Sequence, residues 1–462
     1  MIDRDILSKA IKVALKHGGD YADIFVESKR SLSVQLEDGK IEKLLKGTDA
    51  GVGIRVIFQG KSAYGYTNEF SQGAILELAE TVSKASKGPA LQKTIDLRSI
   101  NPKVDFVIKI PPEEVESRKK INMLKDADRT ARAYNQSIKQ VLVVYRESAQ
   151  TVRIATSDGV MADDRRVHTL ALVQVIAAED GTIQTGYEPV GGHTGFELFD
   201  EHPLNVISEK AAGRAVMMLK ARRAPAGRMP VVIASEAGGT MIHEAIGHGL
   251  EADLAGQGLS VYSEKLGQNV ASSLITVIDD ATLPNRRGSF RFDDEATPSQ
   301  RTVLVDRGVL VAYMYDRLNA LKEGKRSTTG NGRRESYQHR PIPRMSNTFI
   351  APGTDSPEEI IRSVQQGLLV KKMGGGQVNT VTGDFVFEVQ EGYIIKDGLV
   401  GEPVRGATLT GNGPQILKSM DMVASDLGFA IGTCGKDAQG VPVSDAMPTV
   451  RIPEIVVGGE VT

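Results

Sequence analysis

The spacing of apolar residues changes several times along the first ninety positions. Over residues 5–17 they recur every three or four positions, which predicts an amphipathic helix, and a Gly-Gly pair ends it. The period then becomes that of strands, with a hairpin turn at Asp38-Gly39. The predicted strands cover residues 23–27, 31–36, 40–45, 51–58 and 62–66. Residues 71–88 return to helical spacing, and this order of helix, strands and helix favours an α+β fold.

The middle of the chain repeats this mixture of patterns. Helical spacing and apolar runs predict helices at residues 113–134 and 205–219 and strands at 140–145, 151–155 and 166–177. Residues 221–228 are basic and contain Pro and Gly, which is typical of a boundary between domains. Beyond a single helix expected over residues 238–254, short strands and glycine turns dominate.

These patterns divide the chain into three expected parts. The predicted domains are an N-terminal α+β domain at residues 1–95, a central α+β domain at 96–224 and a β-rich C-terminal domain at 225–462. The hairpin signals predict antiparallel sheets in the N-terminal half. The fold class predicted for the whole chain is therefore α+β.

Charge and composition narrow the classes of function. The 462 residues include 56 Lys and Arg against 58 Asp and Glu, a net charge of −2, so the chain lacks the basic field of a general nucleic-acid binder. No apolar run approaches the ~18 residues of a membrane span, and the charged N-terminal residues predict no secretory signal. The single cysteine excludes an intramolecular disulfide framework and fits a reducing compartment. We expect a cytoplasmic protein without nucleic-acid or membrane partners.

The most informative segment holds two histidines five positions apart, His243-Glu244-x-x-x-His248. On a regular helix, position i+5 lies ~140° around the axis from position i, so the two imidazoles could not share a metal ion. A π-bulge, in which hydrogen bonds run from i to i+5, would bring them together, and such bulges cluster at functional sites. Gly247 and Gly249 flank the second histidine and make the distortion easier. The spacing therefore predicts a metal site only if the helix is irregular here.

The residue types in this segment suit zinc hydrolysis. Two neutral imidazoles can hold Zn²⁺, which polarises a carbonyl group and lowers the pKa of water. Glu244, adjacent to a ligand, can accept the water proton and pass it to a leaving amine. The alternative is two unrelated histidines on one helix.

A catalytic zinc site needs a third protein ligand. The lone cysteine, Cys434, lies in a glycine-rich loop far downstream, and thiolate is a strong zinc ligand. Two histidines and one cysteine would leave one coordination position open. Glu251 and Asp253 are rival ligands, and Fe²⁺ would tolerate a similar ligand set. An inert, buried cysteine is the other interpretation of Cys434.

Four segments resemble the TldD/PmbA (TldE) family of metallopeptidases. They are MIHEAIGHGLEAD at residues 241–253, GNGRRESYQHRPIPRMSNTFI at 330–350, VTGDFVFEVQEGYII at 381–395 and IGTCGKDAQGVPVSDAMPTVRI at 431–452. Since the motif is intact, the chain is similar to the catalytic, TldD-type subunit. The resemblance implies zinc ligands His243, His248 and Cys434, a catalytic Glu244 and a C-terminal metal-bearing domain. It also implies a paired assembly, with a TldE/PmbA-type partner or a second copy, in which peptides reach the zinc through an enclosed space.

Two further segments have more than one interpretation. Residues 383–395 predict two strands, whose exposed edge could pair with a peptide or which could lie inside a core sheet. The preceding Gly374-Gly375-Gly376 allows the close backbone approach that an extended substrate needs. Residues 321–344 contain seven Lys and Arg residues, which could clamp a peptide carboxylate, contact a partner subunit or form a solvated loop.

The sequence thus predicts a zinc-dependent peptidase that cleaves unfolded or short peptides, with Glu244 as the general base. The alternative is a non-catalytic regulator that binds a protein such as gyrase or its toxin. A zinc hydrolase of non-peptide amides would use the same chemistry. Glu244 separates the first two hypotheses, because a binding protein has no use for a carboxylate beside a metal ligand.

Overall fold

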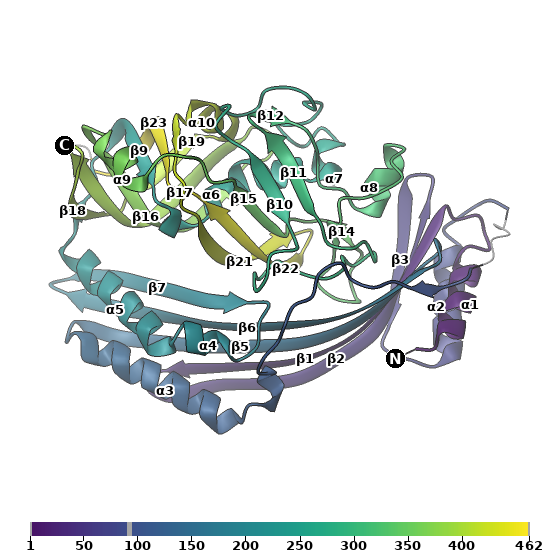
Figure 1. Ribbon diagram of the computed structural model, residues 1–462. Coiled ribbons are helices and arrows are strands. Elements are labelled where there is room, and N and C mark those ends of the chain that lie inside the picture. Colours follow the sequence, from purple (N-terminus) through teal and green to yellow (C-terminus); the bar gives the residue numbers. More distant parts are fainter. Residues whose placement is uncertain (1, 90–94, 461–462) are drawn as a thin grey trace.

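The computed structural model describes residues 2–89 and 95–460, and its N-terminal half is built on one strongly curved sheet (Figure 1). The strand order is β3-β2-β1-β5-β6-β4, and β7 pairs with β6. The strands are Tyr21–Glu37 (β1), Lys40–Phe58 (β2), Lys61–Thr67 (β3), Arg98–Ser99 (β4), Ile138–Thr156 (β5), Val160–Glu179 (β6) and Thr182–Gly192 (β7). Strands from both sides of residue 96 therefore share one sheet.

Helices cover this sheet at two separate places. The helices are Arg4–Ala14 (α1), Gln72–Ser83 (α2), Ser117–Tyr134 (α3), Leu198–Glu201 (α4) and Leu204–Lys220 (α5), with a 3-10 turn at Pro112–Glu114. Helices α1 and α2 pack on alternate residues of β1 and β2, such as Ile24 and Ile54. Helices α3 and α5 pack on β5 and β6 through residues such as Val143 and Val173. The long helices predicted from the sequence in this half are thus present, with slightly different ends.

The sequence predicts short strands where the structure has long ones. Residues 23–27 and 31–36 belong to the one strand β1, which pairs with β5 without a break from Asp23↔Thr156 to Glu37↔Leu142. The polar residues between the two apolar runs lie between the two helical covers and are mostly exposed or half-buried. The apolar runs therefore mark the parts of β1 that helices cover, whereas the backbone pairing of β1 also continues through the uncovered part between them.

The C-terminal part contains two larger sheets, and it lies against the concave side of the first sheet (Figure 1). A six-stranded sheet has the order β12-β11-β10-β15-β22-β21, and an eight-stranded sheet has the order β16-β9-β23-β19-β17-β18-β8 with β20 beside β23. The strands of the first are Val277–Asp280 (β10), Arg301–Asp306 (β11), Val309–Leu310 (β12), Asn347–Ile350 (β15), Gly428–Lys436 (β21) and Gln439–Met447 (β22). Those of the second are Arg222–Arg223 (β8), Gly227–Ile233 (β9), Gln366–Val378 (β16), Asp384–Lys396 (β17), Leu399–Arg405 (β18), Thr408–Asn412 (β19), Met422–Val423 (β20) and Val450–Gly458 (β23).

Short elements complete this part. They are the hairpin Gly332–Arg333 (β13) and Ile342–Pro343 (β14), and the helices Thr240–Ile242 (α6), Ala252–Ala255 (α7), Arg317–Lys322 (α8), Pro357–Arg362 (α9) and Gly413–Ser419 (α10). A 3-10 turn spans Ser235–Ala237. The two sheets and the irregular segment between α6 and α7 share the largest hydrophobic core of the chain. The α+β class and the β-rich C-terminal part are as predicted, and no helix in the described ranges is long and apolar enough to cross a membrane.

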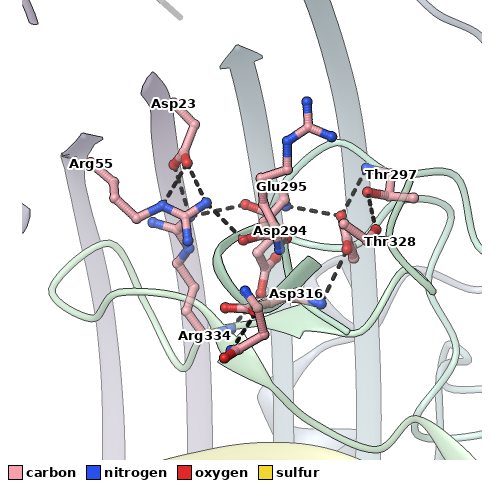
Figure 2. A network of polar contacts seen from close by, with 12 residues as sticks. Asp23, Arg55, Asp294, Glu295, Thr297, Asp316, Thr328 and Arg334 are labelled. Carbon is pink, nitrogen blue, oxygen red and sulfur yellow. Dashed lines mark hydrogen bonds and ion pairs between the residues drawn. The ribbon is translucent and has the colours of Figure 1, made fainter. Parts of the chain in front are cut away.

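A buried ionic network joins the two halves (Figure 2). Arg55 of β2 donates to Asp23 of β1 and to Glu295 of the C-terminal part, with both nitrogen–oxygen distances at 2.7 Å. Arg334 contacts the other oxygen of Asp23 at 3.3 Å. Burial raises the pKa of Glu295, although Arg55 opposes this shift. The halves are therefore held together by charges that would be costly to separate.

Candidate metal centre

The segment expected to be one helix over residues 238–254 is a series of short turns. Helix α6 passes into a π-helical turn, His243–Gly247, then into a 3-10 turn, His248–Leu250, and α7 follows. The N–H of His248 donates to the carbonyl of His243, five residues earlier. The single-helix prediction is wrong, and the irregularity that the histidine spacing required is present.

Close packing explains the glycines of this turn. A Cβ on Gly247 would lie 2.2 Å from Sδ of Met345, and one on Gly249 would lie 2.6 Å from the Tyr262 ring. Neither glycine has a positive φ. These glycines therefore make room for neighbouring side chains, and the backbone freedom expected of them is not what the turn requires.

The π-turn brings three predicted residues together. Nε2 of His243 lies 3.2 Å from Sγ of Cys434, and Nε2 of His248 lies 3.4 Å from the same sulfur. The three ligand atoms lie within 4.8 Å of one another, and the imidazole planes are at 88°. Cys434 comes from β21, at the edge of the six-stranded sheet. Three side chains of this kind converging on one point can hold a metal ion.

The electrostatics of the cluster favour a thiolate. Burial alone would raise the pKa of Cys434, but hydrogen bonds and charges from His243 and His248 lower it to about 5. For His243 the signs are reversed: burial alone would lower its pKa, but the hydrogen bond and charge of Cys434 raise this pKa above the ordinary value. A cysteine that ionises readily is a prepared metal ligand, since the thiolate is the form that binds.

Glu251 and Asp253, the rival ligands, lie behind His248 and outside the three-residue cluster. Oε2 of Glu251 is 3.0 Å from Nδ1 of His248 and 2.9 Å from Nζ of Lys436. Lys436 also donates to Asp253 at 2.7 Å. Burial would raise the pKa of Glu251, but Lys436 and His248 lower it to about 2. No local pattern pointed to Lys436, because its two carboxylate partners lie more than 180 residues away along the chain.

A cavity of about 590 Å³ opens in front of the cluster. Its walls include the three clustered side chains, the half-buried Glu244, residues 431–436 of β21 and residues 376–378 of β16. Asp445 of β22 also lines it, and burial raises the pKa of this carboxyl group to about 6. Glu244 was predicted from the sequence, whereas Asp445, which belongs to no recognisable motif, was not.

The basic segment at residues 321–344 is more ordered than a solvated loop. Arg333, Arg334 and Arg344 are buried, whereas Lys322 and Lys325 are exposed. The Arg344 guanidinium donates to the carbonyls of Cys434 and Gln439 and so supports the β21–β22 hairpin behind the cluster. The segment therefore includes structural supports of the site.

The two short strands predicted within residues 383–395 are one strand, β17. It pairs with β16 on one side and with β19 and β18 on the other. Of the two interpretations of this segment, the exposed edge is wrong and the core sheet is correct. Of the three preceding glycines, Gly376 lies against the cavity, and a Cβ there would lie 1.9 Å from the Phe387 ring.

Three models of one protein family match successive parts of the chain. Models of the PmbA/TldA metallopeptidase domain 1, central domain and C-terminal domain match residues 22–87, 110–219 and 226–459. The chain belongs to this TldD/PmbA metallopeptidase family. The clustered residues all lie in the part that matches the family's C-terminal domain.

Relatives in this family align with nearly the whole chain. The metalloprotease TldD homolog of Haemophilus influenzae is 40% identical over 453 residues, or 95% of this chain and 93% of that protein. A metalloprotease of Methanocaldococcus jannaschii is 35% identical and covers 98% of this chain and 99% of its own. The zinc metalloprotease TldD homolog of Saccharolobus solfataricus is 27% identical, with 98% and 100% covered.

Solved structures share the fold at low identity. A Thermotoga maritima protein described as a candidate modulator of a DNA gyrase has a TM-score of 0.81 and 20% identity, covering 98% of this chain and 99% of its own. TldE from Thermococcus kodakarensis has a TM-score of 0.77 and 17% identity, covering 98% and 100%. At these identities the likeness concerns the fold alone.

Proposed function

We propose that this chain is a zinc-dependent peptidase that cleaves unfolded or short peptides. The observation that carries the proposal is the convergence of His243, His248 and Cys434 at the wall of a cavity that Glu244 also lines. Membership of a metallopeptidase family supports it, and one relative is itself named a zinc metalloprotease.

The donor set fits zinc. Two imidazole nitrogens and one thiolate are ligands that Zn²⁺ favours, and three protein ligands leave one position open, as in catalytic sites. His243, His248 and Cys434 would hold the ion. When bound, zinc would polarise the scissile carbonyl and lower the pKa of a water molecule. Fe²⁺ would accept a similar set, but the thiolate favours zinc.

The residues of the chain supply the proton transfers and the binding surface. Glu244 follows His243 directly and lines the cavity, so its carboxylate can accept a proton from the attacking water and deliver it to the leaving amine nitrogen. Strand β21 is an edge strand of its sheet and forms one wall of the cavity. An extended peptide can therefore pair with it as an added strand. Such a surface recognises backbone and therefore suits unfolded chains.

The proposed working form is a pair of subunits in the cytoplasm. The partner would be a TldE/PmbA-type chain or a second copy, and TldE of Thermococcus kodakarensis has the same fold. An enclosed site between two subunits would exclude folded proteins by size. A stable interface of this kind would bury more than ~1,200 Å².

Metal analysis combined with a digestion assay tests the proposal. Purified protein, alone and co-expressed with a TldE-type chain, should contain about one zinc per TldD-type chain and should degrade unfolded casein, and a chelator should abolish both. Metal-free protein that digests casein equally well would refute the zinc mechanism. Zinc-loaded protein without hydrolysis in any assembly would favour the non-catalytic regulator.

A further inference from the structure

A second cavity, of about 510 Å³, lies between the curved N-terminal sheet and the C-terminal part. Strands β1, β2, β5 and β6 form one wall, and residues 287–290 and 333–335 of the C-terminal part form another. Thr433 lines both this cavity and the one at the metal centre. Because Thr433 precedes Cys434, the two cavities border the same point of β21.

The lining of this second cavity is strongly cationic in a chain of net charge −2. Its basic residues are Lys29, Lys46, Arg146, Arg166, Arg287, Arg333 and Arg334, against the three carboxylates Glu147, Asp294 and Glu335. Each carboxylate already has a partner. Glu147 pairs with Lys120 at 2.6 Å, Asp294 pairs with Arg166 at 2.6 Å, and Glu335 accepts the N–H of Gly440. The carboxylates therefore leave much of the cationic charge uncompensated.

Among residues 2–89 and 95–460, five of the seven cationic groups have no carboxylate partner, and three of the five, Lys29, Arg146 and Arg287, lie where β1 and β5 face the C-terminal part. The side chains of Arg146 and Lys29 make no hydrogen bond or ion pair there, and the guanidinium of Arg287 donates only to the carbonyl of Gly432 and the hydroxyl of Thr433. Burial and the charge of Arg146 lower the pKa of Arg287 to about 10. Neighbouring guanidiniums that repel one another in a partly enclosed space are stabilised by an anion.

We propose that this cavity binds a carboxylate of the peptide substrate, either the C-terminal carboxylate or an acidic side chain near the scissile bond. The inference rests on the proposed peptidase function and specifies its substrate class. Guanidinium groups match carboxylates in geometry. The apolar walls at Leu32, Leu170 and Phe290 suit the neighbouring side chains of a peptide. A peptide held at the metal centre reaches the cavity at Thr433.

Three related peptides test the inference. Two have the same sequence and end in a free acid or an amide, and the third is the amide with Glu in place of a Gln near the C-terminus. The wild type should cleave a carboxylate-bearing peptide with kcat/KM about tenfold above the plain amide. Preference for the acid identifies the terminal carboxylate as the ligand, and preference for the Glu amide identifies the side chain. Equal cleavage of all three peptides overturns the inference.

The double variant Arg146→Gln, Lys29→Gln should lose this preference, because it removes two charges without breaking a side-chain hydrogen bond or an ion pair. Arg307→Gln, on an exposed turn between β11 and β12, is the matched control and should keep it. A preference that survives in the double variant contradicts the assignment to this cavity. If the wild type cleaves none of the peptides, the peptidase proposal fails instead. In that case, fluorescence anisotropy measures the binding of the same peptides, each carrying a fluorescent label. Equal affinity for the acid, the amide and the Glu-containing amide would overturn the inference.

Discussion

Nδ1 of His248 lies 3.0 Å from Oε2 of Glu251, a carboxylate that is fully buried. This contact occupies one ring nitrogen and leaves Nε2 facing the sulfur of Cys434. Lys436 bonds to the same carboxylate oxygen and holds it in place. The tautomer and orientation of a ligand histidine are set by such partners.

Replacement of Glu251 by Gln should weaken zinc binding by about 10–100-fold, because the amide is a poorer partner for Nδ1–H of His248. A competition titration with a chromogenic chelator measures the affinity. Glu454→Gln removes an exposed glutamate paired with Arg228 and serves as the control. Equal zinc affinity in wild type and Glu251→Gln would show that the contact does not support the site.

Cys434→Ser tests the third ligand. A neutral hydroxyl binds zinc far less strongly than a thiolate, so the zinc content after dialysis should fall well below one per chain. Elemental analysis of the purified variant gives the stoichiometry, and circular dichroism checks that the fold persists. If zinc remains at the wild-type level, Cys434 is a packing residue and the ligand set must be revised.

Arg55→Met tests the network between the two halves. The change removes the cationic partner of Glu295 and leaves Asp23 with only the 3.3 Å contact to Arg334. Glu295, Asp23 and Arg334 are all buried. Breaking a buried pair in this way costs about 3–5 kcal/mol of unfolding free energy. Chemical denaturation measures it. Arg228→Met, which breaks the exposed pair with Glu454, should cost less than about 1 kcal/mol, and equal losses in both variants would contradict the account.

The buried His193 should make the protein less stable in mild acid. Burial lowers its pKa from 6.5 to about 4, so between these values the unfolded chain binds a proton that the native protein does not. Stability from this residue is complete above pH 6.5 and declines as the pH falls towards 4, by about 2 kcal/mol at pH 5. Denaturation at pH 7 and pH 5 should show a smaller loss for His193→Asn than for the wild type. An identical loss in both proteins would exclude this contribution.

The convergence of His243, His248 and Cys434 was predictable, because its signals are a short motif and a unique residue. The five-residue spacing of His243 and His248 requires an irregular helix, and Cys434 is the one cysteine of the chain. The supports of the cluster were not predictable. Glu251 and Lys436, beside the cluster, are 185 residues apart in the sequence, and Arg55 and Glu295, which join the two halves, are 240 apart. Such charge pairs follow no periodic pattern in the sequence. A charged residue in a buried ion pair cannot be distinguished there from one on the surface.

In the fold, too, local features were predictable from the sequence and features that depend on distant contacts were not. Helix α1 and the hairpin at Asp38-Gly39 follow from local spacing and turn chemistry. The full length of β1 does not, since its central residues are polar and only the paired backbone of β2 and β5 keeps them extended. The order of the sheets depends on contacts between distant segments, as between β9 and β23.

The contrast between Glu244→Ala and His243→Ala tests the central claim most directly. If Glu244 is the general base, Glu244→Ala should retain one zinc per chain and the wild-type fold, while peptide hydrolysis falls by about 10²–10⁴-fold. His243→Ala should lose zinc and activity together. Zinc content and kcat/KM measured on the same preparations decide the matter. Turnover of Glu244→Ala within a few fold of the wild type would contradict the peptidase mechanism proposed for this chain.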